Sequence, residues 1–62
     1  MATDELRAFG LLIKTRRKTA RLSLERLAVL CGLSSSSIKH VERGRVSLAT
    51  CSALLATPEL RL

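Results

Sequence analysis

The 62-residue sequence predicts an all-α fold made of four short helices and the beginning of a fifth. Apolar residues recur at helical spacing, as in Leu6, Phe9 and Ile13, which occupy positions i, i+3 and i+7. The sequence lacks the period-two alternation that marks strands, and Phe9 is its single aromatic residue. Serine, threonine, glycine and proline interrupt the apolar pattern where helices are expected to start or stop. A chain of this length makes one small domain.

The first helix is expected to begin after Thr3 or Asp4, because either residue can cap it. Asp4 and Glu5 would then lie at the positive end of the helix dipole, where negative charge is stabilising. Basic residues within 14–18 occupy its last turns, and the helix should end near Thr19 or Ala20.

The next two helices are separated by a short turn that contains Gly32. Ser23 is expected to cap the second helix, and Gly32 can end it in the left-handed conformation. Ser34 is expected to cap the third helix, which should continue to about Arg43 before Gly44 stops it. The inward stripe of the second helix consists of Leu24, Leu27, Ala28 and Cys31.

Ser47 is expected to cap the fourth helix. Its apolar positions are Leu48, Cys51, Leu54 and Leu55. Thr57, Pro58 and Glu59 form a further start signal, with a cap, a proline at the first helical position and an acid. Three residues follow, so the fifth helix should be truncated.

The net charge of +6 is concentrated in one part of the chain. Between residues 14 and 26 there is one acid, Glu25, among six cations: Lys14, Arg16, Arg17, Lys18, Arg21 and Arg26. Concentrated positive charge attracts polyanions, which means nucleic acid or an anionic membrane. The simpler interpretation is a solvated face that promotes solubility.

Small domains are marginally stable, and disulfides, metals or self-association often supplement their cores. Cys31 and Cys51 fall on apolar positions of predicted helices, so we expect buried free thiols in preference to a bridge or a reactive cysteine. Because His40 is the one histidine and no paired-cysteine spacing exists, we expect no metal and no cofactor. Of the three supplements, self-association is therefore the one that we expect.

We expect neither a membrane-spanning segment nor a signal peptide in this chain. No apolar run reaches roughly 18 residues, and the N-terminal MATDELRAF has acids where a signal peptide needs cations. Together with free thiols, this predicts a cytoplasmic protein that does not enter a membrane.

Residues 23–44, SLERLAVLCGLSSSSIKHVERG, resemble the helix-turn-helix of the phage Cro/cI repressor family, the XRE-like regulators. The family pattern is a serine or threonine, L-x-x-L-A-x-x-x-G-V/L-S, an isoleucine or leucine four residues later, and E-x-G. The matching residues are Ser23, Leu24, Leu27, Ala28, Gly32, Leu33, Ser34, Ile38, Glu42 and Gly44. The resemblance covers about residues 9–56. It implies a compact four-helix, lambda-repressor-like domain over residues 1–62, with the helix-turn-helix at about 23–43.

The outward face of the third helix follows from its periodicity, independently of the resemblance. Each residue of an α-helix is rotated by about 100° from the one before it. With this rotation, Ile38 and Val41 lie at the centre of the face that is expected to be buried. The opposite row contains no acid, whereas a merely solvated face more often mixes both signs; it consists of Ser36, Lys39, His40 and Arg43. Ser35 lies on its flank.

This outward face is the predicted DNA interface. The resemblance implies base contacts at Ser35 and Ser36, whose small hydroxyl side chains allow a close approach. Lys39 could donate to guanine O6 and N7, and the resemblance makes the position of His40 groove-facing. The alternatives are that the serines only start the helix, and that His40 contacts nothing or only phosphate. The predicted phosphate contacts are Ser23, Ser34, Arg43 and Arg45.

One pair of charges is expected to be structural. The resemblance aligns Arg17 with an arginine that pairs with the glutamate of E-x-G, here Glu42. Glu42 lies at the edge of the predicted core, which suits a partly buried ion pair. Arg17 is therefore not assigned to DNA.

The chain departs from the family in its short turn after E-x-G and in its truncated last helix. Several apolar residues also stand where similar proteins tend to be polar, which suggests a partner surface. We expect a homodimer, although these leucines could instead complete a single core. The predicted interface consists of Leu54, Leu55, Leu60 and Leu62, with Val29 and Leu30 as further candidates.

The sequence therefore predicts a small homodimeric regulator, expected to be a repressor, that binds double-stranded DNA at an inverted-repeat operator. The alternatives are an antitoxin-type interaction module that also binds DNA, and a basic amphipathic peptide on a membrane surface. An enzyme is not expected, because there is one histidine, one aspartate, no nucleophile motif and no phosphate-cradling glycine loop. No small-molecule ligand is expected.

Overall fold

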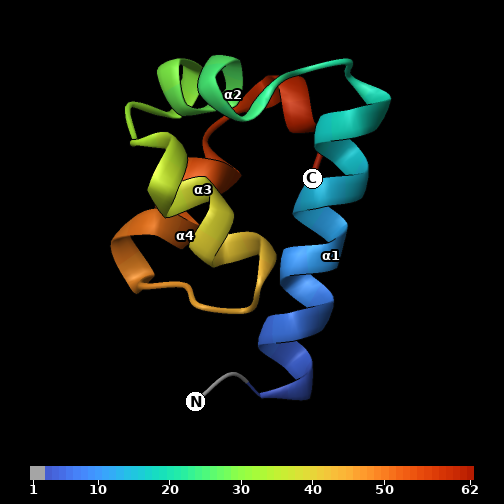
Figure 1. The fold of residues 1–62 in the computed structure, drawn as a ribbon, viewed down its shortest axis with the longest axis vertical. Coiled ribbons are helices and arrows are strands. Elements are labelled where there is room, and N and C mark those ends of the chain that lie inside the picture. Colours follow the sequence, from blue (N-terminus) through green and yellow to red (C-terminus); the bar gives the residue numbers. More distant parts are fainter. Residues whose placement is uncertain (1–2) are drawn as a thin grey trace.

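The computed structural model describes residues 3–62, which form four α-helices and one short 3-10 helix. Their order is α1 (Asp4–Thr19), α2 (Leu24–Cys31), α3 (Ser35–Glu42), α4 (Leu48–Leu55) and η1 (Pro58–Leu60). Figure 1 shows α1 along one side of the molecule, with α2, α3 and α4 stacked beside it. The all-α prediction is confirmed for these residues.

The N-caps of α2, α3 and α4 are the predicted serines, and of the two candidates for α1 the cap is Thr3. A hydroxyl of the N-cap residue accepts a hydrogen bond from the backbone N–H three residues later, which stabilises a helix by about 1 kcal/mol. The four pairs are Thr3 with Leu6, Ser23 with Arg26, Ser34 with Ser37, and Ser47 with Thr50.

The helix ends also follow the expected chemistry, with one exception. Gly32 ends α2 at φ 71°, and Gly44 follows α3 at φ 88°, both in the left-handed region that glycine adopts without strain. The turn between α1 and α2 contains no glycine. There Arg21 takes the left-handed conformation at φ 59°, which the sequence does not indicate.

The core lies where α1 and α2 pack against α3, and η1 closes it against α1 and α4. The buried apolar residues are Ile13, Leu27, Ala28, Ile38, Val41, Leu54 and Leu60. Cys31 and Cys51 are free thiols, as predicted, but each is half-buried. Among residues 3–62, no helix is long and apolar enough to cross a membrane.

Gly10 sets the distance between α1 and α3. It is buried, and a Cβ built at this position would overlap the carbonyl oxygen of Val41 and touch the backbone of Glu42. The two helices therefore approach each other so closely that α1 has no room for a side chain there. No pattern in the sequence indicates this contact.

The structure corrects one expectation about the C-terminal part and distinguishes between the apolar positions of α4. Thr57 does not cap η1: its hydroxyl donates to the carbonyl of Ala53 at 2.9 Å and lies 3.1 Å from Cys31 Sγ. Of the four apolar positions of α4, Leu54 is buried, whereas Leu48 and Leu55 are 84% and 59% exposed. The reason is that α4 is only two turns long and the segment around η1 fills the space beside Leu54.

Candidate nucleic-acid interface

The residues exposed on the outward face of α3 are those that its helical periodicity predicts. Ile38 and Val41 are buried, and the opposite row is exposed: Ser36, Lys39, His40 and Arg43. Glu42, the only acid in this helix, is turned to the edge of the core and is only 11% exposed. The surface that α3 offers to a partner is therefore polar and basic, without a carboxylate.

The four consecutive serines divide into two pairs with different roles. Ser34 caps the helix, and its hydroxyl lies 3.0 Å from the hydroxyl of Ser37. The hydroxyls of Ser35 and Ser36 have no hydrogen-bond partner among the described residues. Ser36 is exposed and Ser35 is half-buried, which agrees with a position on the flank. Two of the four hydroxyls thus stabilise the helix start, and two remain available to a ligand.

The starts of α2 and α3 each leave backbone donors at the surface. Ser23 and Ser34 are both exposed, and each hydroxyl satisfies only the N–H three residues later. The other N–H groups of a first helical turn have no partner inside the helix. Together with the positive end of the helix dipole, they can bind an anion such as a phosphate.

Arg17 connects three segments of the fold. Its Nε donates to Glu42 Oε2 at 2.7 Å, and a second guanidinium nitrogen lies 3.4 Å from Oε1. A third nitrogen donates to the carbonyl of Leu22 at 2.9 Å. The network joins α1, the turn before α2 and the end of α3, so it fixes the orientation of the two helices of the motif. Its partners neutralise Arg17, which is only 11% exposed.

The segment after α3 supplies further positive charge. Arg43 and Arg45 are both exposed, and the N–H of Arg45 donates to the carbonyl of His40 at 2.8 Å. They line a pocket of about 730 Å³ between this segment and the first turns of α1. Arg7 of α1 lines the same pocket. No sequence pattern points to Arg7, because it lies 36 positions before Arg43 in the chain and only the fold brings the two together.

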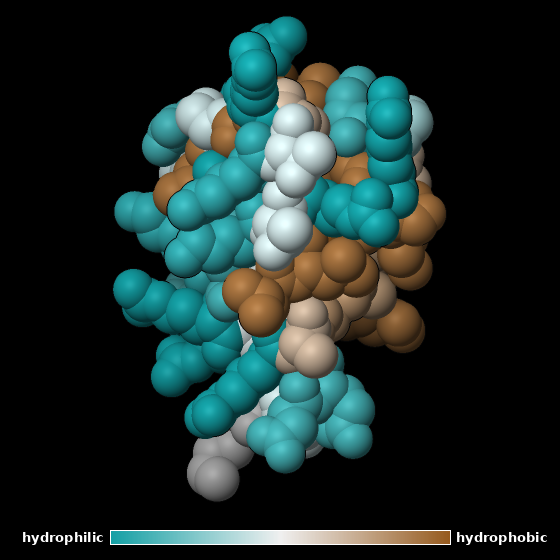
Figure 2. Space-filling view, turned by 90° about the vertical axis from the view of Figure 1, so that its right-hand side faces the viewer, coloured by the Kyte–Doolittle hydropathy of each residue, from teal (hydrophilic) through white to brown (hydrophobic). Residues whose placement is uncertain are grey.

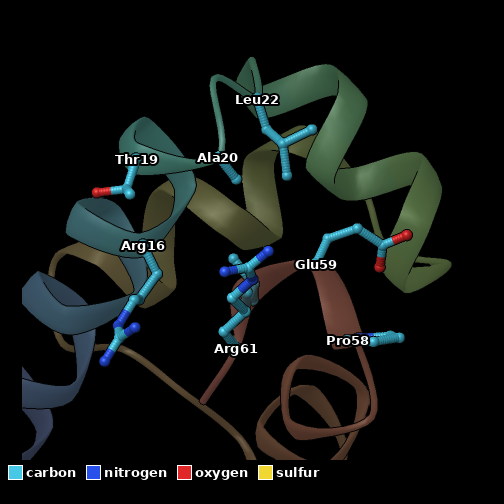
Figure 3. A pocket seen from close by; sticks show the side chains of 8 residues that line it. Arg16, Thr19, Ala20, Leu22, Pro58, Glu59 and Arg61 are labelled. Atoms are coloured by element: carbon cyan, nitrogen blue, oxygen red, sulfur yellow. The ribbon is translucent and has the colours of Figure 1, made fainter.

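A second pocket, of about 580 Å³, lies between the end of α1 and the C-terminal turn (Figure 3). Arg16 and Thr19 reach it from α1, Ala20 from the C-cap of that helix, and Glu59 and Arg61 from the other side. Its charges are mixed, and none of its lining residues belongs to α3. This pocket is therefore separate from the outward face of α3. Among residues 3–62, no group of histidine, cysteine and acidic side chains is arranged to hold a metal ion.

The structure corrects half of the predicted dimer interface. Leu54 and Leu60 are 0% and 1% exposed, because their side chains fill the core of the single chain. A side chain that is already buried has no area to offer to a second copy. Leu55 and Leu62 are 59% and 44% exposed and can still contact a partner.

Other apolar side chains are exposed elsewhere on the molecule. Val29 and Leu48 are largely exposed, whereas Leu30 is half-buried. Leu11 and Leu12 are exposed on α1. Figure 2, which views the side of the molecule formed by α1, shows an apolar area bordered by hydrophilic side chains. Exposed apolar area of this kind is typical of a surface that contacts another protein.

The comparison with protein families gives one match. A family described as a helix-turn-helix domain matches residues 8–61. No curated protein and no solved structure shows significant similarity to the chain.

Proposed function

Because the chain belongs to the helix-turn-helix domain family, of the Cro/cI-like type, we propose that it binds double-stranded DNA sequence-specifically. Membership of this family indicates DNA binding, and the sequence specificity is our inference. The single observation that carries the proposal is the exposed, acid-free face of α3, the second helix of the motif. An α-helix fits into the major groove of B-DNA, where each base pair presents a distinct pattern of donors and acceptors.

The proposed base contacts come from the middle and the start of α3. Lys39 and His40 are exposed and long enough to reach base edges, and Lys39 can donate to guanine O6 and N7. The hydroxyls of Ser35 and Ser36 have no hydrogen-bond partner within residues 3–62, and such hydroxyls can donate to a base or accept from it. These four residues form the proposed sequence-reading set.

The proposed phosphate contacts flank this set. Ser23 and Ser34 stand at the starts of the two helices of the motif, where backbone N–H groups are available to a phosphate oxygen. Arg43 and Arg45 follow the other end of α3 and carry exposed guanidinium groups. Contacts of this kind fix the register of a protein on DNA without reading the sequence.

The finer proposal is a single domain over residues 1–62 that acts as a homodimeric cytoplasmic regulator. A two-fold dimer would place two copies of α3 in successive major grooves, about 34 Å apart, on an inverted repeat. Leu55 and Leu62 are the leucines of the predicted interface that remain exposed. A bound dimer would act as a repressor by covering a promoter.

Selection from random duplex DNA, followed by footprinting, tests this proposal. We expect enrichment of an inverted repeat and an affinity that falls steeply with salt, as counterions are released from the phosphates. If the selection recovers no preferred sequence, and the affinity changes with salt concentration but not with DNA sequence, sequence-specific recognition is rejected. The same experiment performed at concentrations where the protein is monomeric would separate recognition from dimerisation.

The exposed apolar residues favour one second candidate, an antitoxin-type module that binds another protein as well as DNA. Val29 and Leu48 are 70% and 84% exposed, more than Leu55 and Leu62, so apolar area is exposed beyond the two leucines proposed for the homodimer. Co-purification of a stoichiometric partner from the native source, in a complex that V29E or L48E disrupts, would support this candidate. Purification of the homodimer alone would reject it.

A further inference from the structure

Three arginines from two separate segments line the pocket between α1 and residues 43–47. Arg7 comes from the second turn of α1, and Arg43 and Arg45 from the connection between α3 and α4. No residue that lines this pocket carries a negative charge. The lining of this pocket is therefore basic, with three arginines and no internal counterion.

The three guanidinium groups are also without a counterion elsewhere in the described part of the chain. The ion pair found within residues 3–62 joins Arg17 to Glu42, and none involves Arg7, Arg43 or Arg45. Asp4 and Glu5 precede Arg7 in α1, but neither residue lines the pocket. Neither forms a salt bridge with Arg7, Arg43 or Arg45. Like charges gathered in this way repel one another, so an anion between them would be stabilised.

The backbone on both sides of the pocket is held in place. The N–H groups of Gly44 and Arg45 donate to carbonyls of α3, each at 2.8 Å. On the other side, Gly10 packs directly against the backbone at the end of α3. Arg7 precedes Gly10 by less than one turn of α1, so its distance from Arg43 depends on this tight contact and not on a flexible loop.

The start of α4 adds to the positive potential. Ser47, the N-cap of α4, lines the pocket, so the positive end of the α4 dipole lies at its wall. This contribution is smaller than that of the three arginines, and it has the same sign.

We propose that this pocket binds a phosphate group of the DNA backbone beside the groove that α3 enters, and that Arg7 is a DNA contact supplied by α1. The inference rests on the proposed function. A guanidinium group matches a phosphate with two parallel N–H donors, which makes arginine suited to this ligand. Arg43 belongs both to the outward row of α3 and to the pocket, so the pocket begins where the DNA-facing row ends.

The test measures how the affinity for DNA depends on salt concentration in wild type, R7A and R16A. Arg7 and Arg16 are both exposed arginines of α1, but Arg16 lines the separate pocket of mixed charge. R16A therefore controls for the loss of one positive charge. Loss of one phosphate contact lowers the slope of log K against log salt by about 0.9. We expect this decrease in R7A, an unchanged preferred sequence, and a slope for R16A close to that of wild type.

A titration of the DNA-free protein with inorganic phosphate, followed by NMR, separates a backbone phosphate from a free one. We expect shifts at the amides of Arg7, Gly44 and Ser47 that weaken in R7A. If the wild type binds DNA and R7A retains the slope of R16A, the inference is wrong while the proposed function stands. Phosphate shifts with such an unchanged slope would identify a free-anion site and overturn the DNA contact. A wild type that binds no DNA would instead reject the proposed function itself.

Discussion

Arg17 and Glu42, 25 residues apart in the sequence, form a bidentate ion pair at the edge of the core, with Nε and Oε2 2.7 Å apart. Both side chains are 11% exposed, so water satisfies little of either charge. The third donor of Arg17 is satisfied by the carbonyl of Leu22. The guanidinium group thus acts as a connection between α1 and the helix-turn-helix and is not part of the basic surface.

Breaking this ion pair from one side should destabilise the fold. We expect E42A to lower the free energy of unfolding by about 3 kcal/mol, because Arg17 keeps a charge that is largely buried and has lost its partner. Urea unfolding followed by circular dichroism measures the change. R17M/E42L, which removes both charges, should lose less than E42A. If the two variants were equally destabilised, the cost would come from lost packing and not from the unpaired charge.

Replacing either of two glycines by alanine should destabilise the fold, for different reasons. G10A adds a methyl group where the carbonyl of Val41 already lies, so α1 must move away from α3, and overpacking of this kind costs typically 1–3 kcal/mol. G32A meets no atom within 4 Å, but it holds alanine at φ 71°, which costs about 1 kcal/mol.

The two alanine variants can be compared by thermal unfolding. We expect a larger decrease in Tm for G10A than for G32A. Replacement of Gly32 by asparagine, which tolerates the left-handed conformation, should recover part of the loss, whereas no side chain should rescue position 10. A G10A protein as stable as wild type would contradict the tight contact between α1 and α3.

Replacing Lys39 and His40 together should change DNA recognition without changing the fold. Both side chains are exposed and neither makes a hydrogen bond or ion pair within residues 3–62, so K39A/H40A should unfold at the same urea concentration as wild type. Each base-reading contact contributes about 1–3 kcal/mol of discrimination. Selection from random duplex DNA should return a different or less defined site. Recovery of the wild-type site with the same discrimination would mean that other residues read the bases.

Neighbouring leucines on α4 should behave in opposite ways. Leu54 is fully buried, so L54A should lower the free energy of unfolding by about 2–5 kcal/mol. Leu55 is 59% exposed, so L55E should leave the single chain folded and weaken self-association. Sedimentation over a range of concentrations measures the second effect. An L55E protein that dimerises like wild type would show that the homodimer, if formed, uses another surface.

The helices and the outward face of α3 could be predicted because their causes are local. The cap residues bond to an N–H only three positions away, and Gly32 and Gly44 end helices by their own conformational freedom. The exposure of Lys39 and His40 follows from the helical period once Ile38 and Val41 are assigned to the core. These rules need no knowledge of what packs against the segment.

Other features depend on residues distant in the sequence. Leu54 is buried and Leu55 exposed because η1 folds back between α1 and α4, an arrangement that no helical pattern within α4 can indicate. Thr57 turns its hydroxyl back to Ala53 instead of capping η1. Arg7 joins Arg43 at one pocket because Gly10 brings α1 against the end of α3.

Helix boundaries and the buried faces of α2 and α3 were thus encoded within stretches of a few residues, because hydrogen bonds and side-chain periodicity act over one or two turns. The identity of the leucines that close the core, and the grouping of three arginines around one pocket, arose from packing between segments that are tens of residues apart. Close packing excludes whatever does not fit the space left by distant neighbours, and that space exists only once the helices have come together.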